Sequence, residues 1–288
     1  MQKFNDHGHN FNGPILLKKS ASRLLLTSRK NCYINASGRR VMTQRIAYVT
    51  SGMGSLGTAI CRRLAKDGFK VIAGCGPNSQ RKAAWLDDNK KLGFDFIASE
   101  GNVADWESTV KAFEKIKSEI GEIDVLVNNA GTARNVLFRD MQPQEWQAVI
   151  NTNMNSLFNV TKQVVEGMMS RGWGRIINIS SVNAQIGQTG QVNYSTAKSA
   201  VRGFTRALAR EVSARGVTVN TVSPGYLATS KLKTVTPVQV IDKIVQEIPV
   251  RRLGSPQEIA SICSWLASDE SGFATGADFS VNGGLHMG

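Results

Sequence analysis

The sequence predicts an α/β protein with a single domain, built on a doubly wound parallel sheet of about seven strands. Short apolar segments alternate with segments of helical length from residue 42 to the end of the chain. Alternation of this kind predicts parallel β-α-β units. The apolar segments are almost continuous, as expected of strands that helices cover on both faces. A chain of 288 residues with 41% hydrophobic residues can form such a core without disulfides or a metal.

The elements can be assigned in chain order. The first apolar segment directly precedes a glycine-rich turn, and each later one follows a segment of helical length. The expected strands are 45–50, 70–73, 94–98, 124–127, 175–180, 218–222 and 277–281. The expected helices are 56–66, 79–92, 106–120, 143–150, 151–169, 194–214, 237–246 and 256–268. Ligands of such sheets bind at the carboxyl ends of the strands, so functional residues are expected just after each strand.

The first 41 residues differ from the rest of the chain. They contain eight Lys or Arg and one Asp, and so carry +7 of the net charge of +13. We expect residues 1–41 to be a basic, disordered extension and residues 42–288 to be the folded domain. The extension either resembles an organelle transit peptide or lies upstream of a natural start at Met42, and we favour the second interpretation. Its apolar pieces are too short to span a membrane, and we expect a cytoplasmic protein.

Composition excludes several kinds of site. The cysteines form no C-x-x-C pair, so we expect no metal site; they are Cys32, Cys61, Cys75 and Cys263. The histidines lie near the termini, so a Ser-His-Asp hydrolase lacks its base; they are His7, His9 and His286. The moderately basic body suits an anionic ligand such as a phosphorylated cofactor or coenzyme A. We do not expect nucleic-acid binding, because no basic helix or aromatic stacking motif is present.

A glycine-rich turn follows the first predicted strand. Gly52, Gly54 and Gly57 satisfy the pattern G-x-G-x-x-G between a strand and a helix. Small residues at these positions let the backbone approach a pyrophosphate, and the helix N-terminus presents free N–H groups to it. The turn therefore predicts a dinucleotide site.

The second strand favours NADPH over NADH. It ends in Gly74, Cys75 and Gly76, without the acidic residue that holds an adenosine 2′-hydroxyl. Arg81 and Lys82 follow, and a cation at this place suits the 2′-phosphate of NADPH.

A serine, a tyrosine and a lysine form the third signal. Ser181 follows a strand, and Tyr194 and Lys198 are four residues apart on one face of a predicted helix. A nearby ammonium favours the phenolate and so lowers the pKa of a tyrosine. Tyr194 would then exchange a proton with a substrate oxygen, while Ser181 donates a hydrogen bond to the same atom.

With these motifs in place, the chain from Met42 to Gly288 resembles the short-chain dehydrogenase/reductase family. The resemblance also rests on Asn128-Asn129-Ala130-Gly131, Asn153 and Ser223-Pro224-Gly225. It implies a Rossmann-type fold and a homotetramer. It also implies that Tyr194 is the general acid in reduction, that Lys198 holds the nicotinamide ribose, and that Asn153 positions a water that relays protons through Lys198.

The resemblance extends to the residues that line the ligands. Those along the cofactor are Gly52, Gly54, Leu56, Gly57, Gly76, Arg81, Gly101, Asn102, Val103, Asn129, Ala130, Gly131, Tyr194, Lys198, Pro224, Gly225 and Thr229. Those along the substrate are Asn135, Gln188, Thr189, Gly190, Gln191 and Tyr226.

Several segments (45–50, 71–78, 93–105 and 282–288) resemble the family members that reduce acetoacetyl-CoA for polyhydroxybutyrate synthesis. We therefore expect NADPH-dependent reduction of an acyl-CoA thioester, acetoacetyl-CoA, to the (R)-3-hydroxyacyl-CoA. Two alternatives stay open. One is a 3-oxoacyl-carrier-protein reductase, whose substrate has the same pantetheine thioester. The other is a non-catalytic NADP(H)-binding protein.

The chain departs from the family pattern at four positions. Ser51 and Ser55 stand where the pattern has glycines, and a serine forced to a positive φ costs about 1–2 kcal/mol. Asn135 and Thr189 stand where the similar reductases have an aspartate and a phenylalanine. We expect these two losses to lower the kcat/KM for acetoacetyl-CoA below that of those reductases.

Overall fold

The computed structural model describes residues 32–34, 40–42, 44–229, 232, 234 and 236–288. The chain divides into two units, 1–43 and 44–288. In the first unit, strands β1 (Cys32–Ile34) and β2 (Arg40–Met42) pair in antiparallel fashion. The rest of the expected basic extension lies outside the described residues, and the domain boundary at residues 41 and 42 stays a prediction.

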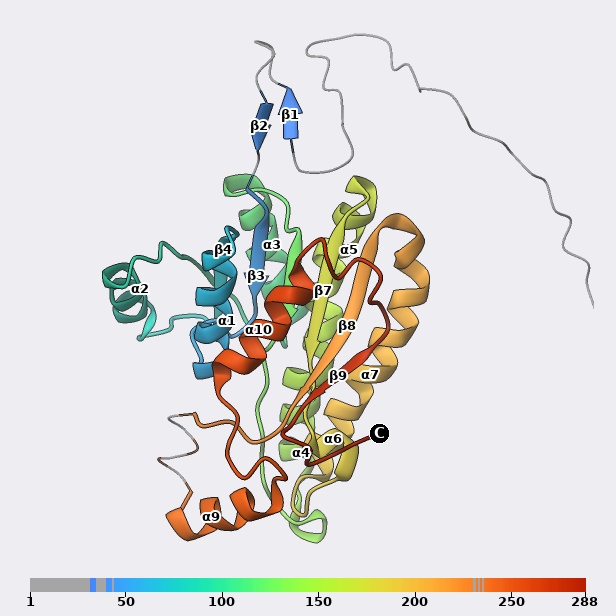
Figure 1. Ribbon diagram of the computed structural model, residues 1–288. Helices are drawn as coiled ribbons and strands as arrows, with labels where there is room; N and C mark the ends of the chain where they lie inside the picture. Colours follow the sequence, from blue (N-terminus) through green and yellow to red (C-terminus); the bar gives the residue numbers. More distant parts are fainter. Residues whose placement is uncertain (1–31, 35–39, 43, 230–231, 233, 235) are drawn as a thin grey trace, which may run out of the picture. The chain divides into compact units, whose positions relative to one another are not determined.

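Seven parallel strands form the sheet of the second unit, as predicted (Figure 1). They are β3 (Ile46–Val49), β4 (Lys70–Cys75), β5 (Ile97–Glu100), β6 (Val125–Asn128), β7 (Gly174–Ile179), β8 (Val217–Pro224) and β9 (Asp278–Val281). Their order is β5-β4-β3-β6-β7-β8-β9. The chain therefore winds outward in both directions from β3 and β6. A crevice for ligands is expected where the winding reverses, at the carboxyl ends of these two strands.

Helices cover both faces of this sheet (Figure 1). On one face are α1 (Ser55–Lys66) and α10 (Pro256–Ala267). On the other are α3 (Trp106–Glu119), α5 (Ser156–Arg171) and α7 (Val192–Val212). Within the described residues, no helix has the length and apolar composition needed to cross a membrane.

Alternate strand residues build two separate cores. Val49 and Val71 pack with Ile60 and Leu64 of α1 on the first face. Tyr48 packs with Ile72, Phe113 and Val160 on the second. Successive side chains of a strand point to opposite faces, so an apolar run is needed to fill both cores. This is the physical reason for the continuous apolar segments.

The helices that follow β4 and β6 can be compared with the predicted ranges. The helix α2 (Lys82–Lys91) begins three residues later than the predicted 79, after Asn78 turns the chain with a φ of 54°. The helix α4 (Pro143–Ile150) matches the prediction and has a capping box formed by Gln142 and Glu145. The segment Asn151–Asn155 continues α4 as a π-helix before α5 begins.

Two further helices lie near the carboxyl end of the sheet. The helix α9 (Val238–Glu247) agrees with the prediction to within one residue at each end. The helix α6 (Asn183–Ile186) was not predicted. Four residues make one turn, which is too short for a periodic apolar pattern.

Candidate active site

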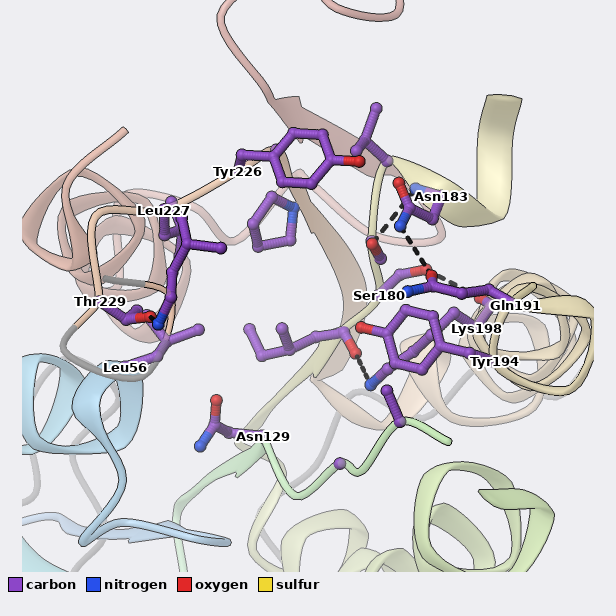
Figure 2. A pocket seen from close by; sticks show the side chains of 18 of the residues that line it. Leu56, Asn129, Ser180, Asn183, Gln191, Tyr194, Lys198, Tyr226, Leu227 and Thr229 are labelled. Atoms are coloured by element: carbon purple, nitrogen blue, oxygen red, sulfur yellow. Dashed lines mark hydrogen bonds between the residues drawn. The ribbon is translucent and has the colours of Figure 1, made fainter. Parts of the chain in front are cut away.

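The carboxyl ends of β6, β7 and β8 open into a cavity of about 370 Å³ (Figure 2). Eleven predicted site residues line it: Leu56, Asn129, Gly131, Ser181, Gln191, Tyr194, Lys198, Pro224, Gly225, Tyr226 and Thr229. These residues come from five separate stretches of the sequence. The fold brings them together, because the parallel strands end at one edge of the sheet and the first turns of α1 and α7 lie at that same edge.

Tyr194 and Lys198 lie one turn apart on α7 and reach the cavity from the same side (Figure 2). The Nζ atom of Lys198 is 5.9 Å from the centroid of the Tyr194 ring. The ammonium is buried and donates a hydrogen bond to the carbonyl oxygen of Ile179, at 2.8 Å. The helical spacing predicted from the sequence therefore places the phenol and the ammonium side by side.

Burial changes the titration of both groups. Burial raises the pKa of Tyr194, and a hydrogen bond with Ser181 opposes the rise. The Lys198 ammonium is directed to the Ile179 carbonyl, and the group that lowers the pKa of Tyr194 here is Ser181. The expectation that Lys198 also lowers this pKa stays a prediction. Burial lowers the pKa of Lys198 to about 8. The phenol is thus protonated at neutral pH, which is the form that donates a proton during reduction.

Asn153 lies behind the cavity wall in the π-helical segment and does not line the cavity. Its Nδ2 donates a hydrogen bond to the Thr132 carbonyl oxygen at 2.8 Å, and its Oδ1 accepts one from the Thr132 backbone N at 3.3 Å. Gly131 separates it from the lysine: a Cβ on Gly131 would lie 2.8 Å from Asn153 Oδ1 and 3.3 Å from Lys198 Nζ. The Asn153 oxygen and the Lys198 ammonium therefore both face Gly131, and the role of Asn153 in a water relay stays a prediction.

Three glycines and one serine determine the backbone conformation of the glycine-rich turn. Gly52 lies so close to β4 that a Cβ there would be 2.8 Å from the Cα of Ala73. Gly57 faces the carbonyl oxygen of Ser51, where a Cβ would also collide. Gly54 is the N-cap of α1 at a φ of −75°. The left-handed residue is Ser51, with a φ of 51°. The turn thus needs a positive φ at the first position where the family pattern has a glycine.

We predict that Ser51→Gly stabilises the protein by about 1 kcal/mol, because glycine adopts the left-handed region without the penalty of a Cβ atom. Ser55→Gly is the matched control, since Ser55 is the first helical residue of α1 and has no positive φ. Chemical denaturation of both variants measures the difference. A Ser51→Gly variant that is no more stable than Ser55→Gly would contradict the assignment of strain to Ser51.

The N-terminus of α1 is free to receive an anion. Gly54 contributes no side-chain cap, and the first turn of the helix contains no acidic residue. The first N–H groups of a helix lack partners within it and carry partial positive charge, so they suit a pyrophosphate. Leu56, in this first turn, also lines the cavity. The turn and the cavity thus form one continuous edge for a dinucleotide.

After the end of β4, one cationic side chain is available for the adenosine part of a dinucleotide. Lys82 forms an ion pair with Glu100, which also accepts a hydrogen bond from the backbone N of Asn78 at 3.3 Å. Arg81 is exposed and has no ion-pair partner among the residues that the structure describes. Arg81 is therefore the better placed of the two predicted cations for a 2′-phosphate. Gly101 follows β5 and is tied to β4 by a hydrogen bond from its N to the Cys75 carbonyl, at 3.0 Å.

Of the predicted substrate residues, Gln191 and Tyr226 line the cavity, and each is hydrogen-bonded to another predicted residue behind it. Gln191 donates to Asn135 Oδ1 at 3.0 Å, and Tyr226 donates to Gln188 Oε1 at 3.3 Å. The carbonyl oxygen of Gly190 accepts from the backbone N of Val136 at 2.9 Å. Of the predicted site residues, these do not line the cavity itself: Gly52, Gly54, Gly57, Gly76, Arg81, Gly101, Asn102, Val103, Ala130, Asn135, Asn153, Gln188, Thr189 and Gly190.

Eight lining residues escaped the sequence analysis: Thr132, Ala133, Ile179, Ser180, Val182, Asn183, Leu227 and Leu232. All of them except Leu232 lie within two residues of a predicted one, and most lie at or shortly after the end of a strand, a signal that could have identified them. Asn183 is linked to Ser181, whose Oγ accepts a hydrogen bond from the Asn183 backbone N at 3.2 Å. In the described ranges, no group of three or more His, Cys, Asp or Glu side chains is arranged to hold a metal ion.

Known proteins resemble this chain over almost the whole second unit. A family model described as short chain dehydrogenase matches residues 45–239. An acetoacetyl-CoA reductase of Cupriavidus necator is 70% identical over 86% of this chain and 100% of its own length. A 3-oxoacyl-[acyl-carrier-protein] reductase of Escherichia coli K12 is 40% identical over 84% of this chain and 98% of its own. A crystal structure titled as a gluconate dehydrogenase from Agrobacterium tumefaciens aligns with a TM-score of 0.80 at 28% identity, covering 84% of this chain and 95% of that one.

Proposed function

We propose that this chain, which belongs to the short-chain dehydrogenase family, reduces acetoacetyl-CoA with NADPH to (R)-3-hydroxybutyryl-CoA. The observation that carries the proposal is the Tyr194 phenol, kept protonated by burial and hydrogen-bonded to Ser181 in a cavity at the carboxyl edge of the sheet. The acetoacetyl-CoA reductases of Cupriavidus necator and Allochromatium vinosum, 70% and 49% identical, support the substrate.

The chain's own residues would perform the steps at the ketone. Ser181 donates a hydrogen bond to the ketone oxygen and stabilises the negative charge that develops on it. Tyr194 donates its proton to that oxygen. Lys198 would hold the ribose hydroxyls of the cofactor, and its ammonium would place positive charge near the phenol, 5.9 Å from the centroid of the Tyr194 ring. Asn153 fixes the loop that contains Thr132 beside this lysine.

The residues present fit NADPH. The free N-terminus of α1, the loop from Asn129 to Gly131 and the buried ammonium of Lys198 lie along one edge. The cofactor, when bound, supplies the hydride for the ketone carbon. Arg81 offers the cation that distinguishes NADPH from NADH.

Parallel kinetics test the proposal. Acetoacetyl-CoA and acetoacetyl-carrier protein would each be assayed with NADPH and with NADH. We expect the highest kcat/KM for acetoacetyl-CoA with NADPH. Higher values with the carrier protein would favour the second candidate, which the 40% identical carrier-protein reductase supports. NADPH binding without any ketone-dependent oxidation would favour the non-catalytic alternative. The loss of turnover from Asn135 and Thr189 stays a prediction that the same kinetics measure.

A second copy of this chain is the proposed partner at the groove between α5 and α7. This groove has a volume of about 490 Å³, and its apolar lining consists of Phe158, Val165, Met169, Phe204, Ala207, Leu208 and Val212. Phe158 is 56% exposed and stacks on Trp106, itself 40% exposed. Exposed apolar area of this kind marks an interface. We propose that two such dimers form a homotetramer. Sedimentation would show four chains, and a monomer at micromolar concentration would contradict this.

The proposal also covers the pathway that uses the product and the compartment in which the protein acts. From the family resemblance, we propose that the product enters polyhydroxybutyrate synthesis in the cytoplasm.

A further inference from the structure

An ion pair joins the first residue of α2 to the last residue of β5. The ammonium of Lys82 is paired with one carboxylate oxygen of Glu100. The other oxygen accepts a hydrogen bond from the backbone N of Asn78, in the loop after β4, at 3.3 Å. The side chains of Lys82 and Glu100 are 41% and 33% exposed, so a ligand can approach both of them.

This pair lies between two parts of the chain proposed to line the cofactor. Arg81, proposed to hold the 2′-phosphate, directly precedes Lys82. Gly101, also proposed to line the cofactor, directly follows Glu100. The ladder pairs Glu100 with Cys75, the last residue of β4. The carboxylate of Glu100 therefore reaches the loop after β4, where an acidic residue of an NAD-dependent enzyme would hold the ribose 2′-hydroxyl.

The charge on this carboxylate favours one dinucleotide over the other. A carboxylate accepts a hydrogen bond from the 2′-hydroxyl of NADH and repels the phosphate that replaces this hydroxyl in NADPH. The hydrogen bonds from Lys82 and from Asn78 lower the pKa of Glu100, and Lys115 of α3 adds a weaker effect in the same direction. Glu100 is thus an anion at neutral pH, and the ammonium of Lys82 compensates its charge.

We infer that Lys82 is a specificity-determining residue, which acts by neutralising Glu100. With the pair intact, the phosphate of NADPH meets Arg81 without an uncompensated anion beside it. The hydroxyl of NADH then has to compete with two donors that already use the carboxylate. Without Lys82, the same carboxylate repels NADPH and accepts the hydroxyl of NADH. The inference rests on the proposed use of NADPH and adds to it the ion pair that disfavours NADH.

Equilibrium binding tests this inference, because it requires no ketone. The dissociation constants of NADPH and of NADH would be measured with the full chain by fluorescence titration, and the readout is their ratio. Lys82→Ala should lower the preference for NADPH by a factor of about 10 to 100, the order of the repulsion between two anions a few ångströms apart at a protein surface. High salt should reduce this shift. NADH should bind more tightly than to the natural protein, a gain that partial unfolding cannot produce.

Three further variants separate this role from a direct contact between Lys82 and the phosphate. Glu100→Gln keeps the shape of the side chain without its charge, so adding Lys82→Ala to it should leave the preference for NADPH almost unchanged. Lys82→Arg retains the positive charge and should keep the preference of the natural protein. Lys91→Ala is the matched control, because Lys91 ends α2 and pairs with Asp87 and Asp88 instead. Its loss should leave the ratio unchanged.

The outcomes distinguish the inference from the proposed function. An unchanged ratio in Lys82→Ala would overturn the inference. An equal loss of NADPH affinity with and without the Glu100 carboxylate would also overturn it, since Lys82 would then bind the phosphate itself. In both cases the natural protein still prefers NADPH and the proposed function stands. If the natural protein prefers NADPH but reduces neither acetoacetyl-CoA nor acetoacetyl-carrier protein, the proposed function fails and the ratios still decide the inference. A natural protein that prefers NADH would overturn both the proposed cofactor and the inference.

Discussion

Replacing Tyr194 by phenylalanine is expected to lower kcat for ketone reduction by a factor of about 10² to 10⁴, the usual contribution of a positioned general acid. The substitution removes only the hydroxyl. The ring keeps its place on α7, and Lys198 keeps its hydrogen bond to Ile179. NADPH binding should therefore be retained. Stopped-flow and steady-state kinetics of NADPH oxidation measure the loss, and fluorescence titration measures the binding.

Tyr48→Phe is the control for this substitution. Tyr48 is a buried tyrosine of β3 whose hydroxyl is hydrogen-bonded to Ser99, and it does not line the cavity. We expect this variant to lose some stability and to keep its kcat. A Tyr194→Phe variant with near-natural kcat would show that another group donates the proton.

The second large effect is expected from Lys198→Met. The methionine has a similar length but cannot donate to the ribose or provide positive charge beside the phenol. Hydrogen bonds to charged groups contribute about 1.5–3 kcal/mol, which corresponds to a factor of about 10 to 150 in affinity. We therefore expect NADPH binding to weaken by about this factor, and kcat to fall as well. Lys198→Arg restores the charge but not the shape of a buried site, so it should recover only part of the binding.

The pH dependence gives an independent check on the lysine. Burial lowers the pKa of Lys198 from its ordinary 10.5 to about 8. The ammonium is therefore present below this pH, and the neutral amine forms as the pH rises through it. NADPH affinity of the natural protein should fall across the range above about pH 8, and this decline should be absent in Lys198→Met. A decline that is the same in both proteins would assign the titration to another group.

Most strands and helices were predictable because their signals are local. Three strands, β4, β5 and β8, end two residues beyond their predicted ends, since pairs such as Cys75 with Glu100 and Pro224 with Val281 continue the ladders. The strand β5 also begins three residues later than predicted, at Ile97. None of the three carboxyl ends has an apolar signal of its own. The π-helical turn around Asn153 was likewise invisible, because it depends on hydrogen bonds to the loop after β6 rather than on the pattern of its own residues.

The residues proposed to be catalytic could be located in the sequence for a related reason. Tyr194 and Lys198 are held together by helical spacing, and Ser181 by its place at the end of a strand. The sequence did not show which neighbouring groups shift the pKa of Tyr194. Whether Lys198 or Ser181 lowers the pKa of Tyr194 depends on the direction of the ammonium, which the Ile179 carbonyl decides. Asn183 was missed because its contacts with Ser181, Gln191 and Tyr226 form only in the folded chain.

The amino-acid sequence by itself determined the alternation of strands and helices, the parallel sheet, the glycine-rich turn and the Ser-Tyr-Lys set, because each depends on residues close together in the chain. Only the tertiary structure decided that the strained residue of the turn is Ser51, that Glu100 pairs with Lys82 while Arg81 stays available, and that the Lys198 ammonium is directed to the Ile179 carbonyl. These features depend on side chains from different strands meeting at one edge of the sheet. Their distances and charges are fixed by packing and not by sequence spacing.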